Sequence, residues 1–527
     1  MILSKNAEIV LKERYLKKIK GGYESAEAMF KRIAKNISKA DKKYNQNPKE
    51  SEREFYRVMS NFEFLPNSPT IRNAGRELQQ LAACFVLPVE DSIEDIFQSV
   101  KDLALIQKTG GGTGFSFSRL RPEGSMVGET GGIASGPVSF MKVFDAATAA
   151  IKEGGTRRGA NMGILRVDHP DIVNFITAKK NTNELINFNI SIALTDKFMN
   201  AVIKNDRYDI YDPHLKKNIG KLNARKIFDL LCEMAWLNGE PGVIFIDRIN
   251  KFNPTHDIGK IESTNPCAEQ PLLPYESCVL GSINLTRFVD NKKINYNKLK
   301  NVVRIAVHFL DNVIDMNKYP TQKIEKMTKS NRKIGLGVMG WADLLIELGI
   351  PYDSDDAISL AESISKIITD EARKNSIELG KKRGSFPNFK NSVYSHKYKH
   401  MRNATVTTIA PTGTLNLIAD CSSGIEPIFS RKFYHDIIGH TRIYEIRKGN
   451  FKTAHEISPY WHVKIQAAFQ KYTDNAVSKT VNLKRSAKVS DVKKIFLLAY
   501  KLGSKGIAVY REKSRDAQVL NVCKVCK

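Results

Sequence analysis

Cysteine and tryptophan are scarce in this sequence, with seven and three residues among 527. Seven cysteines are too few for the disulfide scaffold of a small secreted protein. No apolar run reaches the roughly 18 residues of a membrane-spanning helix, so we predict no membrane partner. The N-terminus also lacks the basic and apolar segments of a secretory signal, so we expect a reducing, cytoplasmic location.

The charge is one-sided, because 82 lysines and arginines oppose 56 acidic residues and give a net +26. One interpretation is a protein that binds nucleic acid or another polyanion through basic patches. The other is a lysine-rich composition without such a patch. Lysines such as Lys31, Lys35 and Lys39 have the spacing of solvated helix faces, which favours the second interpretation. Nucleotide phosphates are compatible ligands in both cases.

The first 63 residues differ in pattern from the rest of the chain. They predict a helical N-terminal region, since apolar residues recur there at helical spacing: Ala26, Met29, Phe30, Ile33 and Ile37. Between residues 64 and 510, short apolar runs alternate with longer helical patterns, which is typical of a parallel α/β fold, either a barrel or doubly wound. Residues 511–527 are polar and predict a mobile C-terminal tail. Strands are predicted at 242–247 and 405–410, and helices at 92–107, 223–237, 298–316 and 355–379.

Three segments raise the question of nucleotide binding. Residues 335–340 have the spacing of a dinucleotide-binding turn, but a polar stretch precedes them where an apolar strand is required, so we interpret the glycines as positions where a helix packs closely. Residues 110–114, Gly-Gly-Gly-Thr-Gly, predict either a ligand contact or a plain turn. Residues 410–416, Ala-Pro-Thr-Gly-Thr-Leu-Asn, predict either a phosphate site at a helix start or a helix cap made by Thr412 or Thr414.

The segment Ser263-Thr-Asn-Pro-Cys-Ala-Glu-Gln270 is the strongest local signal of chemistry. Nearby prolines exclude a regular helix, so we expect an extended loop. Alternate side chains of an extended chain share a face, which would place Asn265, Cys267 and Glu269 together. An amide, a thiol and a carboxylate on one face provide a hydrogen-bond donor, a redox-active atom and a proton acceptor. A buried structural cysteine is the alternative.

Two further pairs of cysteines have suggestive settings. Cys84 and Cys278 each stand at an apparent strand start before apolar residues, but spacing alone does not show that the fold brings them together. Cys523 and Cys526 form a Cys-x-x-Cys pair flanked by lysines. A second pair of ligands is lacking, so we predict no metal site there and favour thiol–disulfide exchange.

Taken together, these motifs resemble ribonucleotide reductase, and most closely its adenosylcobalamin-dependent (class II) branch. The resemblance runs from about residue 60 to the C-terminus, with the motifs in family order. They are Leu65-Pro-Asn-Ser-Pro-Thr, the glycines at 110–114, Gly154-Gly-Thr-Arg-Arg-Gly-Ala-Asn-Met, Asn265-Pro-Cys-Ala-Glu269, Ala410-Pro-Thr-Gly-Thr and the terminal cysteine pair. The fold that the resemblance implies is a ten-stranded α/β barrel at 64–510 with a central finger loop, preceded by the helical region 1–63.

The resemblance also implies roles for residues. Cys267 is the thiyl-radical cysteine, Glu269 the base for the 3′-OH, and Asn265 a hydrogen-bonding partner of the substrate hydroxyls. Cys84 and Cys278 reduce the 2′ carbon and become a disulfide, which Cys523 and Cys526 of the tail then reduce. The residues implied in substrate binding are Ser68, Ala83, Cys84, Gly112, Asn265, Pro266, Cys267, Ala268, Glu269, Pro411, Thr412, Gly413, Thr414 and Leu415.

The expected function is therefore reduction of ribonucleotides to 2′-deoxyribonucleotides, started by adenosylcobalamin. Expected partners are the ribonucleotide substrate, deoxynucleotide or ATP specificity effectors near residues 154–161, thioredoxin or glutaredoxin, and a second copy in a homodimer. A single tyrosine, Tyr510, stands where the two-subunit (class I) enzyme should have adjacent tyrosines. The large subunit of that enzyme is the first alternative. A basic nucleic-acid-binding protein and a generic thiol oxidoreductase are remote ones, and we expect no nucleic-acid partner.

Overall fold

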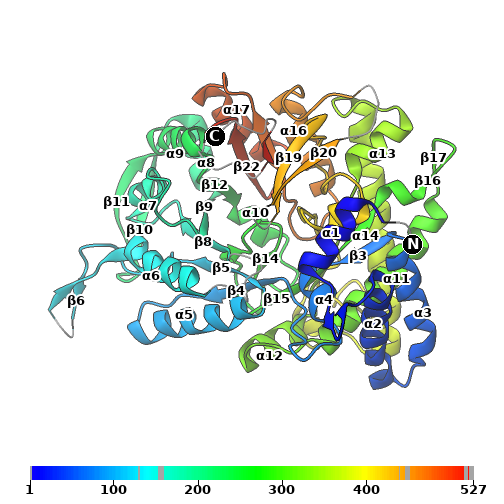
Figure 1. Cartoon of the computed structure of the whole chain (residues 1–527). Coiled ribbons are helices and arrows are strands. Elements are labelled where there is room, and N and C mark those ends of the chain that lie inside the picture. Colours follow the sequence, from blue (N-terminus) through cyan, green and yellow to red (C-terminus); the bar gives the residue numbers. More distant parts are fainter. Residues whose placement is uncertain are drawn as a thin grey trace.

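The N-terminal part of the chain is helical, as its apolar spacing predicts. In this computed structural model, which describes residues 3–128, 131–151, 159–437, 440–445, 451–514 and 520–521, the first helices cover one side of the molecule (Figure 1). Ser25 accepts a hydrogen bond from Ala28 N (3.1 Å) and so starts the second helix. The elements are α1 (Lys5–Arg14), β1 (Lys18–Ile19), β2 (Gly22–Tyr23), α2 (Ala26–Ser38), η1 (Lys39–Tyr44) and α3 (Pro48–Ser60).

A large sheet forms the centre of the rest of the chain. In the part that the structure describes, ten strands join in the order β18-β15-β4-β5-β8-β9-β12-β22-β21, with β3 added beside β15. They are β3 (Phe64–Pro66), β4 (Cys84–Pro88), β5 (Gly112–Ser116), β8 (Asn161–Arg166), β9 (Phe188–Leu194), β12 (Gly242–Phe245), β15 (Ser277–Asn284), β18 (Ile334–Met339), β21 (Thr480–Leu483) and β22 (Gly506–Arg511).

The sheet consists of two parallel halves that run in opposite directions. Strands β4, β5, β8, β9 and β12 are parallel to one another, and so are β15 with β18 and β21 with β22. The halves meet in antiparallel pairs, β4 with β15 and β12 with β22. Residues 405–410, predicted as a strand, instead contribute isolated bridges from Thr407 to Leu336 and from Ile409 to Val477. These bridges connect β18 to the approach to β21, so they close the sheet into the barrel that the resemblance implied.

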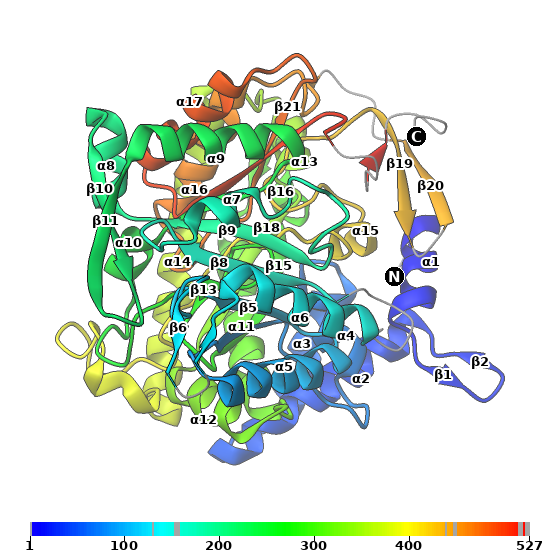
Figure 2. The same ribbon diagram turned by 90° about the vertical axis from the view of Figure 1, so that its left-hand side faces the viewer.

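Helices connect the parallel strands and cover the outside of the barrel (Figure 2). The four helices predicted from periodicity are confirmed as α5, α9, α11 and α14, the last of which continues to Arg383. The helices are α4 (Ser68–Asn73), α5 (Ile93–Lys108), α6 (Gly136–Ala150), α7 (Ile172–Thr177), α8 (Asp196–Lys204), α9 (Ala224–Asn238), α10 (Ile246–Lys251), α11 (Tyr296–Met316), α12 (Gln322–Asn331), α13 (Trp341–Leu348), α14 (Asp355–Arg383), α15 (Leu415–Ala419), α16 (Pro459–Gln470) and α17 (Val489–Lys501). None of the described helices is long and apolar enough to cross a membrane.

Short hairpins complete the fold, and one of them matters for the site. β13 (Ser263–Thr264) and β14 (Pro271–Leu272) enclose the segment that carries Cys267. The remaining short elements are β6 (Met126–Val127), β7 (Gly132–Ile133), β10 (Arg207–Asp212), β11 (Lys217–Asn223), η2 (Leu285–Phe288), β16 (Val289–Asp290), β17 (Lys293–Ile294), η3 (Pro387–Asn391), β19 (Lys432–Ile437), β20 (His440–Glu445) and β23 (Leu520–Asn521), of which β23 pairs with β19.

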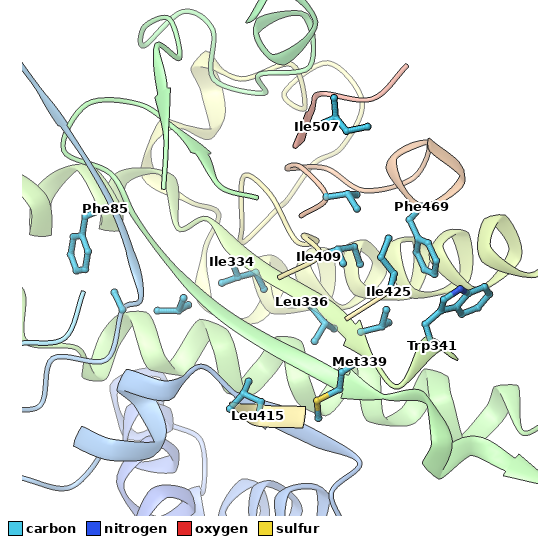
Figure 3. Close-up of a cluster of buried hydrophobic side chains, with 14 of the residues drawn as sticks. Phe85, Ile334, Leu336, Met339, Trp341, Ile409, Leu415, Ile425, Phe469 and Ile507 are labelled. Atoms are coloured by element: carbon cyan, nitrogen blue, oxygen red, sulfur yellow. The ribbon is translucent and has the colours of Figure 1, made fainter. Parts of the chain in front are cut away.

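Apolar side chains fill the space between barrel and helices. Figure 3 shows Leu336 of β18 and Ile409 of the closing segment in one buried cluster, with Trp341 and Phe469 at its end. The rings of Trp341 and Phe469 meet edge to face with centroids 5.0 Å apart. The closing segment is therefore held by packing as well as by its bridges.

A buried network of charges joins the N-terminal helices to the barrel domain. Asp41 of η1 accepts from Arg383 Nη2 of α14 at 2.6 Å and pairs with His308 Nε2 of α11 at 2.8 Å. Behind them, Asp311 pairs with Arg332 at 2.7 Å. Burial raises the pKa of Asp41, but hydrogen bonds, above all from His308, outweigh it and lower the pKa to about 2. Both aspartates are thus ionised at neutral pH, since the arginines beside Asp311 also hold its pKa below the usual range against the effect of burial.

Candidate active site

The finger hairpin, residues 263–272, packs against the inside of the barrel wall. Thr264 pairs with Pro271, and β13 contacts β4, β5 and β8. A Cβ atom on Gly114 of β5 would lie 1.7 Å from the carbonyl oxygen of Thr264. Only glycine permits this approach, so the glycine-rich segment 110–114 provides room for the hairpin as well as a turn.

The tip of the hairpin is a tight turn, and the prediction of an extended segment is wrong. Ala268 N donates to the carbonyl of Asn265 at 3.0 Å, and Ala268 has a positive φ of 63°. The prolines exclude a helix, as expected, but a turn satisfies that condition as well as an extended chain does. The side chains therefore do not alternate along one face.

Asn265 connects the turn to the barrel wall. Its Nδ2 donates to Cys84 Sγ at 3.1 Å, and its Oδ1 accepts from Gln270 N at 3.0 Å. The same side chain thus fixes the shape of the turn and the place of a thiol. Asn265 is 2% exposed, so water does not compete for these bonds.

Glu269 is held at the base of the turn, and its residue is 2% exposed. Its carbonyl oxygen accepts from Thr408 Oγ1 at 2.8 Å and from Ala476 N at 3.0 Å. These bonds attach the hairpin to the segment that closes the barrel. The Glu269 carboxylate and Cys267 both lie near enough to Cys84 to raise its pKa, after burial, which is the largest cause.

Cys84 and Cys278 lie directly opposite each other. They are register partners in the antiparallel pair of β4 and β15, so the fold brings together the two strand starts that the sequence left apart. Both thiols are reduced and fully buried, and burial raises the pKa of each well above its usual value. At neutral pH they are therefore protonated thiols, able to give up hydrogen.

Cys267 faces a cavity of about 860 Å³ in the barrel. Its side chain is exposed to this space, in contrast to the pair at 84 and 278. The lining also includes residues of β12 and β22 and residues from the segment 420–429. The structure thus places one accessible thiol at the cavity and two buried thiols behind it.

Ala83 and Gly112, two other predicted substrate contacts, lie beside the same hairpin. Gly112 N donates to Ala83 O at 2.9 Å, and a Cβ on Gly112 would lie 3.1 Å from Pro266 Cγ. Asn189, which the sequence did not single out, donates from Nδ2 to the carbonyl of Pro266 at 2.9 Å. Its only signal in the sequence is an amide within the largely apolar stretch 188–194.

The loop before α15 is not a helix cap of the kind considered as an alternative. Thr414 stands at the N-cap position but makes no capping hydrogen bond with its side chain. Thr412, at φ 56°, accepts from Gly424 N at 2.8 Å instead. Pro411 and Gly413 line the cavity, and Ser68 of α4 is bonded to Tyr15 Oη at 2.8 Å.

Sequence reasoning missed an ion pair in the cavity wall, between the buried Lys479 and the partly exposed Glu426. Lys479 is bonded to Glu426 and lies 2.9 Å from His462 Nδ1. Burial lowers the pKa of Lys479, while Glu426 opposes that effect. The two residues are far apart in sequence and show no motif, so only the fold reveals them.

The glycines at 335–340 proved to belong to a strand and its end. Gly335 and Gly337 lie in β18, where added Cβ atoms would collide with Gln270 Nε2 at 2.5 Å and Thr408 O at 2.2 Å. The interpretation as helix-packing positions is therefore wrong, because the neighbours are the finger hairpin and the closing segment. The rejection of a dinucleotide turn agrees with this arrangement.

Cys523, Cys526 and residues 154–158 lie outside the described residues.

Comparison with known proteins agrees with this geometry. The family described as "Ribonucleotide reductase, barrel domain" matches residues 82–448 and 436–510, and "Ribonucleotide reductase, all-alpha domain" matches residues 1–79. The chain belongs to the ribonucleotide reductase family. This membership confirms the predicted α/β barrel with its helical N-terminal region.

Curated relatives in this family carry names that mention vitamin B12. A vitamin B12-dependent ribonucleoside-diphosphate reductase of Thermoplasma acidophilum is 50% identical over 88% of this chain and 66% of its own length. One of Mycobacterium tuberculosis is 43% identical over 98% of this chain and 81% of its own. A ribonucleoside-diphosphate reductase subunit alpha of Chlamydia pneumoniae is 28% identical. These identities favour the vitamin B12-dependent branch over the two-subunit alternative.

Proposed function

We propose that this chain reduces ribonucleotides to 2′-deoxyribonucleotides with a vitamin B12 cofactor in its adenosyl form. The observation that carries the proposal is the convergence of three thiols at the finger hairpin. Cys84 and Cys278 are opposite each other, Asn265 bonds Cys84, and Cys267 faces the cavity. Neither a nucleic-acid-binding protein nor a generic thiol oxidoreductase needs a third thiol in a closed barrel.

Each residue of the site has its own role in the proposed reduction. A thiyl radical at Cys267 takes the 3′ hydrogen of the ribose, while Glu269 accepts the 3′-OH proton. The 2′-OH leaves as water with a proton from the pair at 84 and 278. The pair gives its second hydrogen to the 2′ carbon, so it supplies two electrons in all and becomes a disulfide. Glu269 then returns the proton to the 3′ oxygen, and Cys267 returns the 3′ hydrogen. Asn265 holds the substrate hydroxyls, and residues 411–415 hold the phosphates.

The cavity beside Cys267 has the size of a ligand site. Its volume of about 860 Å³ is near the upper end for ligand sites, and small residues of two strands line one wall: Gly242, Gly506 and Ala508. We propose that this wall receives the corrin of adenosylcobalamin. When bound, that group supplies the one-electron chemistry that turns the Cys267 thiol into a radical.

The test is reduction of CDP and CTP by the purified chain alone, with and without adenosylcobalamin. We expect deoxynucleotide only with the cofactor and without a second subunit, and the two substrates distinguish diphosphate from triphosphate use. Cys267→Ser should abolish turnover, because a serine O–H bond is too strong to regenerate a usable radical. Cys232→Ala, in the buried core of α9, is the control and should retain activity. Activity that required an added metal-containing subunit would contradict the proposal.

We further propose that thioredoxin or glutaredoxin reduces the Cys84–Cys278 disulfide through Cys523 and Cys526. A separate protein does not fit inside the barrel, whereas a tethered thiol pair exchanges intramolecularly. Cys523→Ser with Cys526→Ser should leave the first turnover intact and stop later ones with thioredoxin. Dithiothreitol should restore them. Equal multiple-turnover rates with thioredoxin would contradict this role.

The reduced thiols of the cycle favour a cytoplasmic location.

Regulation and assembly are proposals of the same kind. Deoxynucleotides or ATP would select the base through the region around residues 154–161, and a homodimer would provide the interface. Exposed apolar side chains on α5, Ile93, Phe97 and Leu105, support a protein partner on that face. Sedimentation of the chain with and without Phe97→Glu tests the dimer, since a monomeric wild-type protein would contradict it.

A further inference from the structure

The N-terminal helix α1 takes part in the wall of the active-site cavity. It packs against α15, as Figure 2 also shows. Asn6 in its first turn lines the cavity together with Pro411 and Gly413 of the loop before α15. The helix therefore does more than extend the N-terminal helical region, because it borders the segment proposed to hold the substrate phosphates.

The end of α1 contacts two of the predicted substrate residues. Tyr15 Oη lies 2.8 Å from Ser68 Oγ, and Arg14 Nη1 donates to Thr414 Oγ1 at 3.5 Å. The Nε of Arg14 is buried and has no hydrogen-bond partner among the described residues. Among the described residues, no carboxylate forms an ion pair with Arg14 either. The charge of Arg14 is therefore available to a ligand.

The phosphate segment needs such a charge from elsewhere. Residues 410–416 contain hydroxyls and backbone amides but neither lysine nor arginine. A nucleoside diphosphate brings several negative charges, and burying them without a cation is unfavourable. Arginine suits this task because its planar guanidinium can donate two hydrogen bonds to one phosphate.

We propose that Arg14 binds the phosphates of the substrate, with Tyr15 fixing the end of the helix against Ser68. This inference rests on the proposed function and adds a specificity-determining residue to it. The alternative is that Arg14 only stabilises the C-terminal end of α1, where a positive charge is favourable. That role would affect stability but would not discriminate between ligands with and without phosphate.

The experiment is equilibrium binding of CDP and of cytidine to the full chain without cofactor, by calorimetry. For Arg14→Gln we expect the Kd of CDP to rise by about tenfold or more, as for loss of a charge-assisted hydrogen bond, while cytidine binding is unchanged. Lys12→Gln, an exposed cation on the same helix, is the matched control and should change neither. Arg14→Lys keeps the charge without the fork and should give an intermediate loss.

The ratio of the CDP affinity to the cytidine affinity distinguishes phosphate binding by Arg14 from a purely structural role. An unchanged CDP affinity, or an equal loss for CDP and cytidine, in Arg14→Gln would overturn the inference. If that variant does not fold, Arg14→Lys decides in the same way, since a wild-type affinity ratio there would also overturn it. A wild-type chain that binds neither CDP nor CTP would instead contradict the proposed function, so the two failures remain distinct.

Discussion

At the scale of single residues, burial determines how the three thiols of the site react. Cys84 and Cys278 are fully buried, which raises their pKa values, whereas Cys267 is exposed to the cavity. A thiolate reacts with alkylating agents and a thiol hardly does. The hydrogen donors of the proposed reaction are thus protected from the side reactions of an exposed thiolate.

We predict that iodoacetamide labels Cys267 much faster than Cys84 or Cys278 between pH 7 and about 9. The raised pKa values keep the buried pair protonated over this range, and the barrel limits access of the reagent. Mass spectrometry of peptides from timed samples measures each site separately. Cys232, buried in α9 with a raised pKa, serves as an internal control for slow labelling. Labelling of Cys84 as fast as Cys267 would contradict the prediction.

At the scale of elements, the finger hairpin depends on a missing side chain in the barrel wall. We predict that Gly114→Ala displaces the hairpin, because the new Cβ would lie 1.7 Å from Thr264 O. Overpacking of this kind costs about 1–3 kcal/mol or more of unfolding free energy, and the displacement should abolish the proposed ribonucleotide reduction. Chemical denaturation and turnover measure the two effects.

Gly220→Ala is the control for this change. Gly220 lies in β11, and an added Cβ there would meet no atom within 4 Å. Activity and stability should therefore stay close to wild type. Wild-type turnover in Gly114→Ala would show that the hairpin does not need its close approach to β5.

The elements also show what the sequence could predict. The helices α5, α9, α11 and α14 follow from apolar periodicity, which is a local property. The turn at Asn265–Ala268 does not, because prolines exclude a helix without choosing between an extended chain and a turn. The opposition of Cys84 and Cys278 requires pairing of strands that are separated by more than a third of the chain. Lys479 and Glu426 likewise meet only in the fold, so no local signal marks them.

At the scale of the whole molecule, buried charges connect the N-terminal helices to the barrel domain. We predict that Arg383→Met lowers the free energy of unfolding by about 3–5 kcal/mol, because it leaves Asp41 buried without its arginine. Lys381→Met, on the exposed side of the same helix, is the control and should change stability by less than about 0.5 kcal/mol. Denaturant unfolding at neutral pH measures both, and equal effects would contradict the prediction.

The same network predicts sensitivity to acid. The pKa of Asp41 is lowered to about 2 in the folded chain, so the folded state binds this proton less readily than the unfolded state. Its contribution to stability is complete above the unfolded value near 4 and is lost as the pH falls toward 2. Asp41→Asn should therefore flatten the loss of stability between pH 4 and 2. A profile as steep as that of wild type would assign acid sensitivity to other groups.

Because β4 and β15 pair antiparallel, the proposed disulfide between Cys84 and Cys278 would also affect the stability of the fold. Directly opposite residues of such a pair have Cα atoms about 4.5–5.5 Å apart, which is within the range that a disulfide spans. The disulfide can therefore form without moving either strand. After each turnover it would link the two halves of the barrel covalently until the reductant breaks it. Because the bond would join positions about 200 residues apart, the spent enzyme should resist heat better than the active one.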